Sequence, residues 1–147
     1  MFDEGDKTDP YEWWARNGGL ADLFNWSSWS WSGTPNLKYF LTHSSPIRGR
    51  VIWSGERPDL ADAFWQLKIG DVISLDQFHA HGSPQFTSDH TVIVTKIDRA
   101  HHIFGVTMHG NDQKDLSMFD VVRKYNRADT KGYYWLIRMV DSAGSYV

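Results

Sequence analysis

The spacing of hydrophobic residues predicts three helices in this chain. The first begins at Thr34, because threonine is a favoured N-cap and Pro35 follows at the first helical position. Apolar residues at i, i+3 and i+4 form its buried face: Leu37, Phe40 and Leu41. A second, short helix is predicted over residues 57–67. Its apolar side carries Leu60, Phe64 and Leu67.

The third predicted helix has a clear N-terminal signal. Ser117 and Asp120 form a Ser-x-x-Asp capping box, and Leu116 and Val121 are placed for a hydrophobic staple. We therefore expect a helix that starts after Ser117 and runs to about Asn126.

The other patterned segments predict strands. They are rich in Val, Ile, Thr and aromatic residues and are bounded by polar turns: residues 71–76, 90–97, 103–109 and 133–140. Helices thus come first, and an antiparallel sheet interrupted by one helix follows, which predicts an α+β fold. We expect a polar N-terminal segment over residues 1–12, one folded domain over 13–140 and a C-terminal tail over 141–147.

The composition is typical of a globular domain. Of 147 residues, 41% are hydrophobic and 22% are charged, and no apolar run approaches the roughly 18–20 residues of a membrane span. The net charge is −3 and the 15 basic residues are scattered, which argues against a nucleic-acid partner. The acidic, polar start at Met1 lacks the basic and apolar regions of a signal peptide.

Tryptophan and cysteine usage bear on the chemistry. The chain contains no cysteine, which excludes disulfides, cysteine-ligated zinc and any thiol nucleophile of its own. It also contains eight tryptophans, whose flat amphipathic rings suit a groove for a substrate or partner. The groove candidates are Trp13, Trp14, Trp26, Trp29 and Trp31. The alternative is that tryptophans fill the core, as we expect of Trp65 and Trp135.

The leading candidate for chemistry is His90, at the start of a predicted strand. A hairpin that turns around residues 98–102 pairs residues whose numbers sum to 199 or 200. At 199, His90 lies opposite His109, with Cβ atoms about 4.5–5.5 Å apart. At 200, Gly110 takes that place and His109 turns to the other face. A histidine with such a polar partner suits a general base, whereas one that only caps a strand is structural.

Several segments, taken in order, resemble one family. They are 29–34 (WSWSGT), 70–73 (GDVI), 89–96 (DHTVIVTK), 108–117 (MHGNDQKDLS) and 132–137 (GYYWLI). Together they are similar to the putative amidase domain family, which belongs among the papain-like cysteine hydrolases beside the CHAP and NlpC-type cell-wall amidases. The resemblance covers roughly residues 13–138.

This resemblance implies a papain-like, NlpC-like antiparallel sheet packed with helices, and a thiol amidase that needs no cofactor. In such an enzyme, a cysteine in an Asp-Cys-Thr-Asn-Phe-like motif at the start of an N-terminal helix attacks an amide carbonyl. By position, His90 matches the histidine that activates the thiol. His109 is the first choice for the residue that orients this histidine, with Asn111 and Asp112 behind it.

The sequence departs from the family pattern because it has no cysteine and no counterpart of the nucleophile helix in residues 1–12. We therefore expect a domain whose first helix is missing or supplied elsewhere, inactive as this chain alone. An uncovered aromatic surface would favour a protein partner or second chain that covers the gap. A completed enzyme would act on a peptide or N-acyl amide, and relatives of this kind are often exported.

Two other functions fit parts of the sequence. One is a non-catalytic binding or structural subunit of a larger assembly that keeps the amidase-like fold. The other is a zinc hydrolase built on histidines. The zinc hydrolase is disfavoured. The metallo-hydrolase pattern His-x-His-x-Asp-His places its aspartate two residues after the second histidine, whereas Asp89 follows His81 by eight, and His101-His102 fits a turn.

Overall fold

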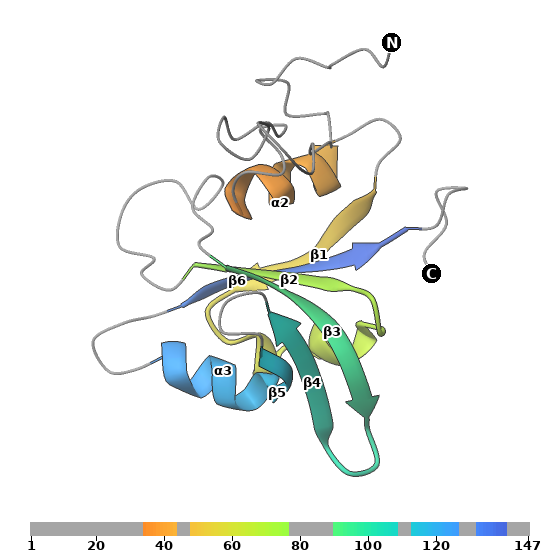
Figure 1. The fold of residues 1–147 in the computed structure, drawn as a ribbon, viewed down its shortest axis with the longest axis vertical. Coiled ribbons are helices and arrows are strands. Elements are labelled where there is room, and N and C mark those ends of the chain that lie inside the picture. The colour runs from red at the N-terminus through yellow and green to blue at the C-terminus, as the bar shows by residue number, and fades with distance from the viewer. Residues whose placement is uncertain (1–33, 44–47, 77–89, 109–112, 127–131, 141–147) are drawn as a thin grey trace, which may run out of the picture.

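The computed structural model describes residues 34–43, 48–76, 90–108, 113–126 and 132–140 (Figure 1). In chain order the elements are α2 (Thr34–His43), β1 (Gly49–Gly55), the 3-10 turns η1 (Pro58–Leu60) and η2 (Asp62–Gln66), β2 (Val72–Asp76), β3 (His90–Asp98), β4 (Ile103–Met108), β5 (Gln113–Ser117), α3 (Met118–Tyr125) and β6 (Tyr133–Met139). The predicted α+β class is confirmed.

The six strands form one sheet in the order β1-β6-β2-β3-β4-β5, and every neighbouring pair is antiparallel. The last strand of the chain, β6, therefore lies between the first two. Figure 1 shows α2 on one side of the sheet and α3 on the other. We call these sides the α2 face and the α3 face.

Side chains alternate between these two faces, so each strand contributes to two cores. The larger core lies on the α3 face and includes Phe64, Leu67, Ile73, Leu75, Val92, Val94, Phe104, Val106, Met118 and Tyr134. The smaller core lies on the α2 face and comprises Phe40, Leu41, Val72, Trp135 and Ile137. Burial of both sheet faces explains why β2 is buried at every position.

Helix α2 starts at Thr34, one residue before the predicted first helical position at Pro35, and buries the predicted face. Phe40 and Leu41 are buried, and the half-buried Leu37 packs against them. Helix α3 also matches its prediction, with Ser117 at the N-cap and Asn126 at the C-cap. Ser117 nevertheless makes no side-chain capping hydrogen bond.

The single helix predicted over residues 57–67 is wrong. The segment forms the two 3-10 turns η1 and η2, separated by Ala61 in an extended conformation. This break takes Leu60 out of register, and its side chain is 72% exposed rather than buried. Phe64 and Leu67 are fully buried in the α3-face core, as predicted.

Two strands, β1 and β5, have no counterpart among the predictions. The five residues of β5 are exposed or half-buried, so they lack the apolar pattern that marks a strand. They are held at the sheet edge by pairing with β4 instead. Strand β1 pairs with β6 through a register shift between Val51 and Trp53, which interrupts simple alternation.

Within the described residues, no helix combines the length and apolarity that crossing a bilayer requires.

Candidate functional site

His90 is the first residue of β3 and lies on the α3 face of the sheet. It pairs with Leu75 of β2, and Leu75 pairs with Tyr134 of β6. These three residues form one row across adjacent strands. Two residues show that His90 lies on the α3 face: its partner Leu75, and Val92, two positions further along β3. Both belong to the α3-face core, and residues two apart on a strand share a face.

The imidazole of His90 lies beside the end of α3. Its ring meets the ring of Tyr125 edge-on, with centroids 6.4 Å apart and planes at 77°. Tyr125 is the last residue of α3 and packs against the core. His90 itself is half-buried, so its ring is positioned by strand and helix yet keeps access to solvent. This is a favourable position for a group that accepts and returns protons.

The hydroxyl of Tyr134, in the same row, is buried without a hydrogen-bond partner among the described residues. Burial raises the pKa of this phenol well above its ordinary value, and the negative charge of Asp59 raises the pKa further. The phenol is therefore neutral at physiological pH. The chain passes close to it at Gly132, where an added Cβ would lie 2.9 Å from the Tyr134 oxygen.

The Gly-Asp motif before β2 has a structural role. Gly70 adopts φ = +94°, a conformation that favours glycine. The two carboxylate oxygens of Asp71 accept hydrogen bonds from the backbone N–H of Met139 at 2.9 Å and of Lys68 at 2.8 Å. Asp71 is buried, with 2% of its surface exposed. Its two hydrogen bonds therefore connect the start of β2 to the end of β6 within the protein interior.

The pairing of β3 with β4 follows the second of the two predicted registers only from Val92 to Val94, because a register shift between Val94 and Lys96 moves the sum to 201 toward the turn. Residue numbers sum to 200 at Val92–Met108, Ile93–Thr107 and Val94–Val106. The other predicted site residues lie outside the described residues: Trp13, Trp14, Trp26, Trp29, Trp31, His109, Asn111 and Asp112. Their relation to His90 stays a prediction.

The described histidines do not gather. His101 lies in the β3–β4 turn with Nδ1 2.7 Å from a carboxylate oxygen of Asp98, and His102 stacks on Phe119. Their placement in a turn is as predicted. In the described ranges, no three His, Cys, Asp or Glu side chains are grouped to hold a metal ion. His79 and His81 lie outside these ranges.

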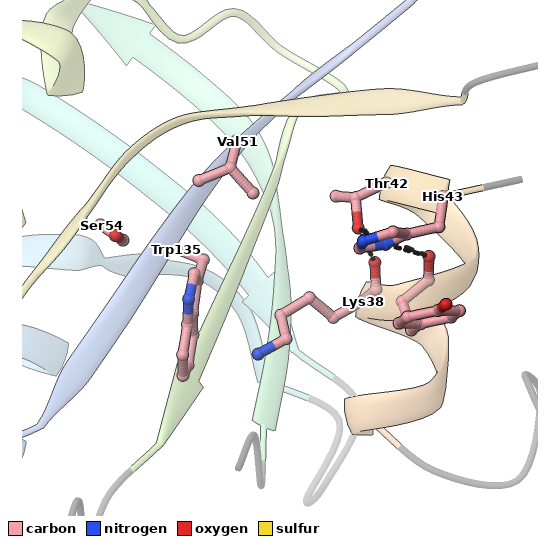
Figure 2. A pocket seen from close by; sticks show the side chains of 7 residues that line it. Lys38, Thr42, His43, Val51, Ser54 and Trp135 are labelled. Atoms are coloured by element: carbon pink, nitrogen blue, oxygen red, sulfur yellow. Dashed lines mark hydrogen bonds between the residues drawn. The ribbon is translucent and has the colours of Figure 1, made fainter. Parts of the chain in front are cut away.

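A pocket of about 510 Å³ opens on the other side of the sheet, between α2 and strands β1 and β6 (Figure 2). It is lined by Lys38, Tyr39, Thr42, His43, Val51, Ser54 and Trp135. Sequence reasoning missed Lys38, because a lysine beside an apolar helix face is usually solvated. Its position directly after Leu37, at the edge of the buried face, was the only available signal.

Fold and site together define an α+β domain on a six-stranded antiparallel sheet, with a half-buried histidine at the start of an inner strand. Residues 3–135 match the family model described as putative amidase domain. The match spans most of the chain, so this protein belongs to the putative amidase domain family. Neither the curated proteins nor the solved structures contain a significant match.

Proposed function

We propose that this chain is the histidine-bearing part of a papain-like thiol amidase and that it lacks the nucleophile of that reaction. Its main support is the position of His90 at the start of β3, beside Tyr125 and open to solvent. The resemblance of the surrounding motifs gives His90 the role of base. The absence of cysteine from all 147 residues removes the group on which that base would act.

The proposed base sets a geometric requirement on the missing thiol. His90 projects from the α3 face, whereas α2 packs on the opposite face. A thiol that exchanges a proton with His90 must approach within hydrogen-bond distance of its imidazole ring. The nucleophile helix must therefore dock on the α3 face near Tyr125. We propose that it comes from a segment outside this sequence or from a partner chain.

In the completed site, His90 would work twice. It first takes the thiol proton, so that the thiolate attacks the amide carbonyl and forms a tetrahedral intermediate. It then gives that proton to the leaving amine as the carbon–nitrogen bond breaks, which leaves a thioester that water hydrolyses. We propose that His109, Asn111 or Asp112 orients His90. The register that pairs Val92 with Met108 would, if it continued, turn His109 to the other face, so Asn111 and Asp112 are tested beside His109. Peptides or N-acyl amides are the proposed substrates.

The test compares the chain alone with a fusion that carries an N-terminal helix containing the Asp-Cys-Thr-Asn-Phe-like motif. Both are assayed against fluorogenic peptide amides and N-acyl amino acid amides. We expect no turnover from the chain alone and cysteine-dependent turnover from the fusion. In the fusion, His90→Ala should lower kcat by about 10²–10⁴-fold, the usual contribution of a general base. His101→Ala is the matched control, since His101 lies in an exposed turn, and it should leave kcat unchanged.

Two results would overturn the proposal. Turnover by the cysteine-free chain would show that another group is the nucleophile. Full activity of the fusion with His90→Ala would remove His90 from the reaction. A folded fusion that binds substrate or partner but never hydrolyses it would instead favour the non-catalytic binding or structural subunit.

A further inference from the structure

The pocket on the α2 face is large enough for a small organic molecule, because known small-molecule sites span about 300–1,000 Å³. It combines the indole of Trp135 with the hydroxyls of Thr42 and Ser54 (Figure 2). Tyr39 and His43 stack at its helix side, with ring centroids 4.1 Å apart. The pocket lies on the face opposite His90, so it is a separate site from the proposed amidase centre.

The amine of Lys38 is held inside this pocket. The residue is only 6% exposed, and its Nζ lies 3.4 Å from the centroid of the Trp135 ring. In Figure 2 the side chain extends from α2 toward that ring. Desolvation lowers the pKa of Lys38 to about 8, and the negative charge of Asp76 on β2 opposes part of this effect. Among the described residues, the other titratable groups around the pocket are Tyr39 and His43 of α2, which line it, and Tyr133 of β6, which packs against Trp135.

The other described lysines are in a different environment. Lys68, Lys96, Lys114 and Lys124 are all exposed. With a pKa lowered to about 8, Lys38 loses its charge at lower pH than a lysine with the ordinary pKa near 10.4. Only the uncharged amine has a lone pair to donate, so burial beside Trp135 makes Lys38 a candidate nucleophile.

We propose that the pocket between α2 and strands β1 and β6 admits small aldehydes and that Lys38 condenses with them to an imine. The nitrogen lone pair attacks the carbonyl carbon and forms the new carbon–nitrogen bond. The carbonyl oxygen then leaves as water, taking up the two protons that the neutral amine loses. No oxidant or reductant is needed, and the reaction is reversible. The aromatic lining favours aldehydes with a flat apolar body.

The experiment traps the imine with cyanoborohydride, whose hydride adds to the imine carbon and leaves a stable secondary amine. The protein is treated with benzaldehyde between pH 6 and pH 9.5, and peptide mapping by mass spectrometry separates Lys38 from the α-amino group and the other lysines. We expect Lys38 to be modified at pH 7.5 at least about tenfold faster than any exposed lysine. Its rate should level off above a midpoint near pH 8.

Three variants connect the reactivity to this geometry. Asp76→Asn removes the charge that raises the pKa of Lys38, so the midpoint should move to lower pH. Val51 lines the pocket and is 43% exposed, so Val51→Trp should fill the pocket with an indole ring. This variant should slow the labelling of Lys38 and leave the labelling of the exposed lysines unchanged. Lys68→Met is the matched control and should leave the Lys38 rate unchanged. Labelling of Lys38 no faster than of the exposed lysines, in the folded wild-type protein, would overturn the proposal.

Discussion

Replacement of Tyr134 by phenylalanine should stabilise this protein. The Tyr134 hydroxyl is buried, and no described residue offers it a hydrogen bond. The ring belongs to the α3-face core and the residue is fully buried. Tyr134→Phe keeps the ring and its packing and removes only the hydroxyl, which is buried away from solvent.

The magnitude follows from the cost of an unpaired buried hydroxyl. Leaving a buried polar group unsatisfied costs about 1–3 kcal/mol, and phenylalanine avoids this cost. We expect Tyr134→Phe to raise the free energy of unfolding by about 1 kcal/mol at pH 7. For a domain of this size, that corresponds to a rise in Tm of about 2–4 °C.

The same variant has a distinct pH dependence. The pKa of Tyr134 is raised in the folded protein, mainly by burial, whereas an unfolded tyrosine titrates near pH 10. Below pH 10 both states keep the proton, so stability does not depend on this group. Above pH 10 the unfolded chain releases the proton first, so wild-type stability falls as the pH rises. The advantage of Tyr134→Phe should therefore grow by about 0.8 kcal/mol between pH 9 and pH 10.5.

Urea unfolding at pH 7, 9 and 10.5 measures both effects. Tyr133→Phe is the matched control, because the Tyr133 hydroxyl donates to Ser54 Oγ at 3.3 Å near the surface. It should change the free energy of unfolding by no more than about 0.5 kcal/mol. A loss of stability in Tyr134→Phe at pH 7 would show that the hydroxyl has a partner. An advantage that stays constant up to pH 10.5 would show that the phenol ionises as freely as in the unfolded chain.

Three further substitutions test the core and the Gly-Asp turn by urea or thermal unfolding. Phe64→Ala should lower the free energy of unfolding by about 3–5 kcal/mol, because Phe64 is fully buried and stacks on Phe104 with ring centroids 4.1 Å apart. A loss below about 1 kcal/mol would contradict the placement of Phe64 in the core. Asp71→Ala should cost about 2–4 kcal/mol, since it leaves two backbone N–H groups unpaired, and hydrogen exchange at Met139 should accelerate. Gly70→Ala should cost about 1–2 kcal/mol through its positive φ alone, because nothing lies within 4 Å of an added Cβ, and an unchanged Tm would contradict that conformation.

Local sequence pattern was sufficient for the elements whose signals are local. The helix at Thr34, the N-cap at Ser117 and the four hydrophobic strands were all predicted, because periodicity and capping depend on near neighbours. The polar strand β5 was missed, since only its pairing with β4 makes it a strand. Leu60 was placed wrongly because the extended conformation of Ala61 breaks the helical periodicity.

At the candidate site, too, some features follow from the sequence alone and others only from the tertiary structure. The sequence alone determined that the chain has no thiol and that His90 begins a strand within recognisable family motifs. Only the tertiary structure decided that His90 shares the α3 face with Tyr125 and that Lys38 is buried against Trp135. Both contacts join residues far apart in the chain. Strand register and helix docking set such contacts, and so they set the solvent exposure and charge environment on which the chemistry of each side chain depends.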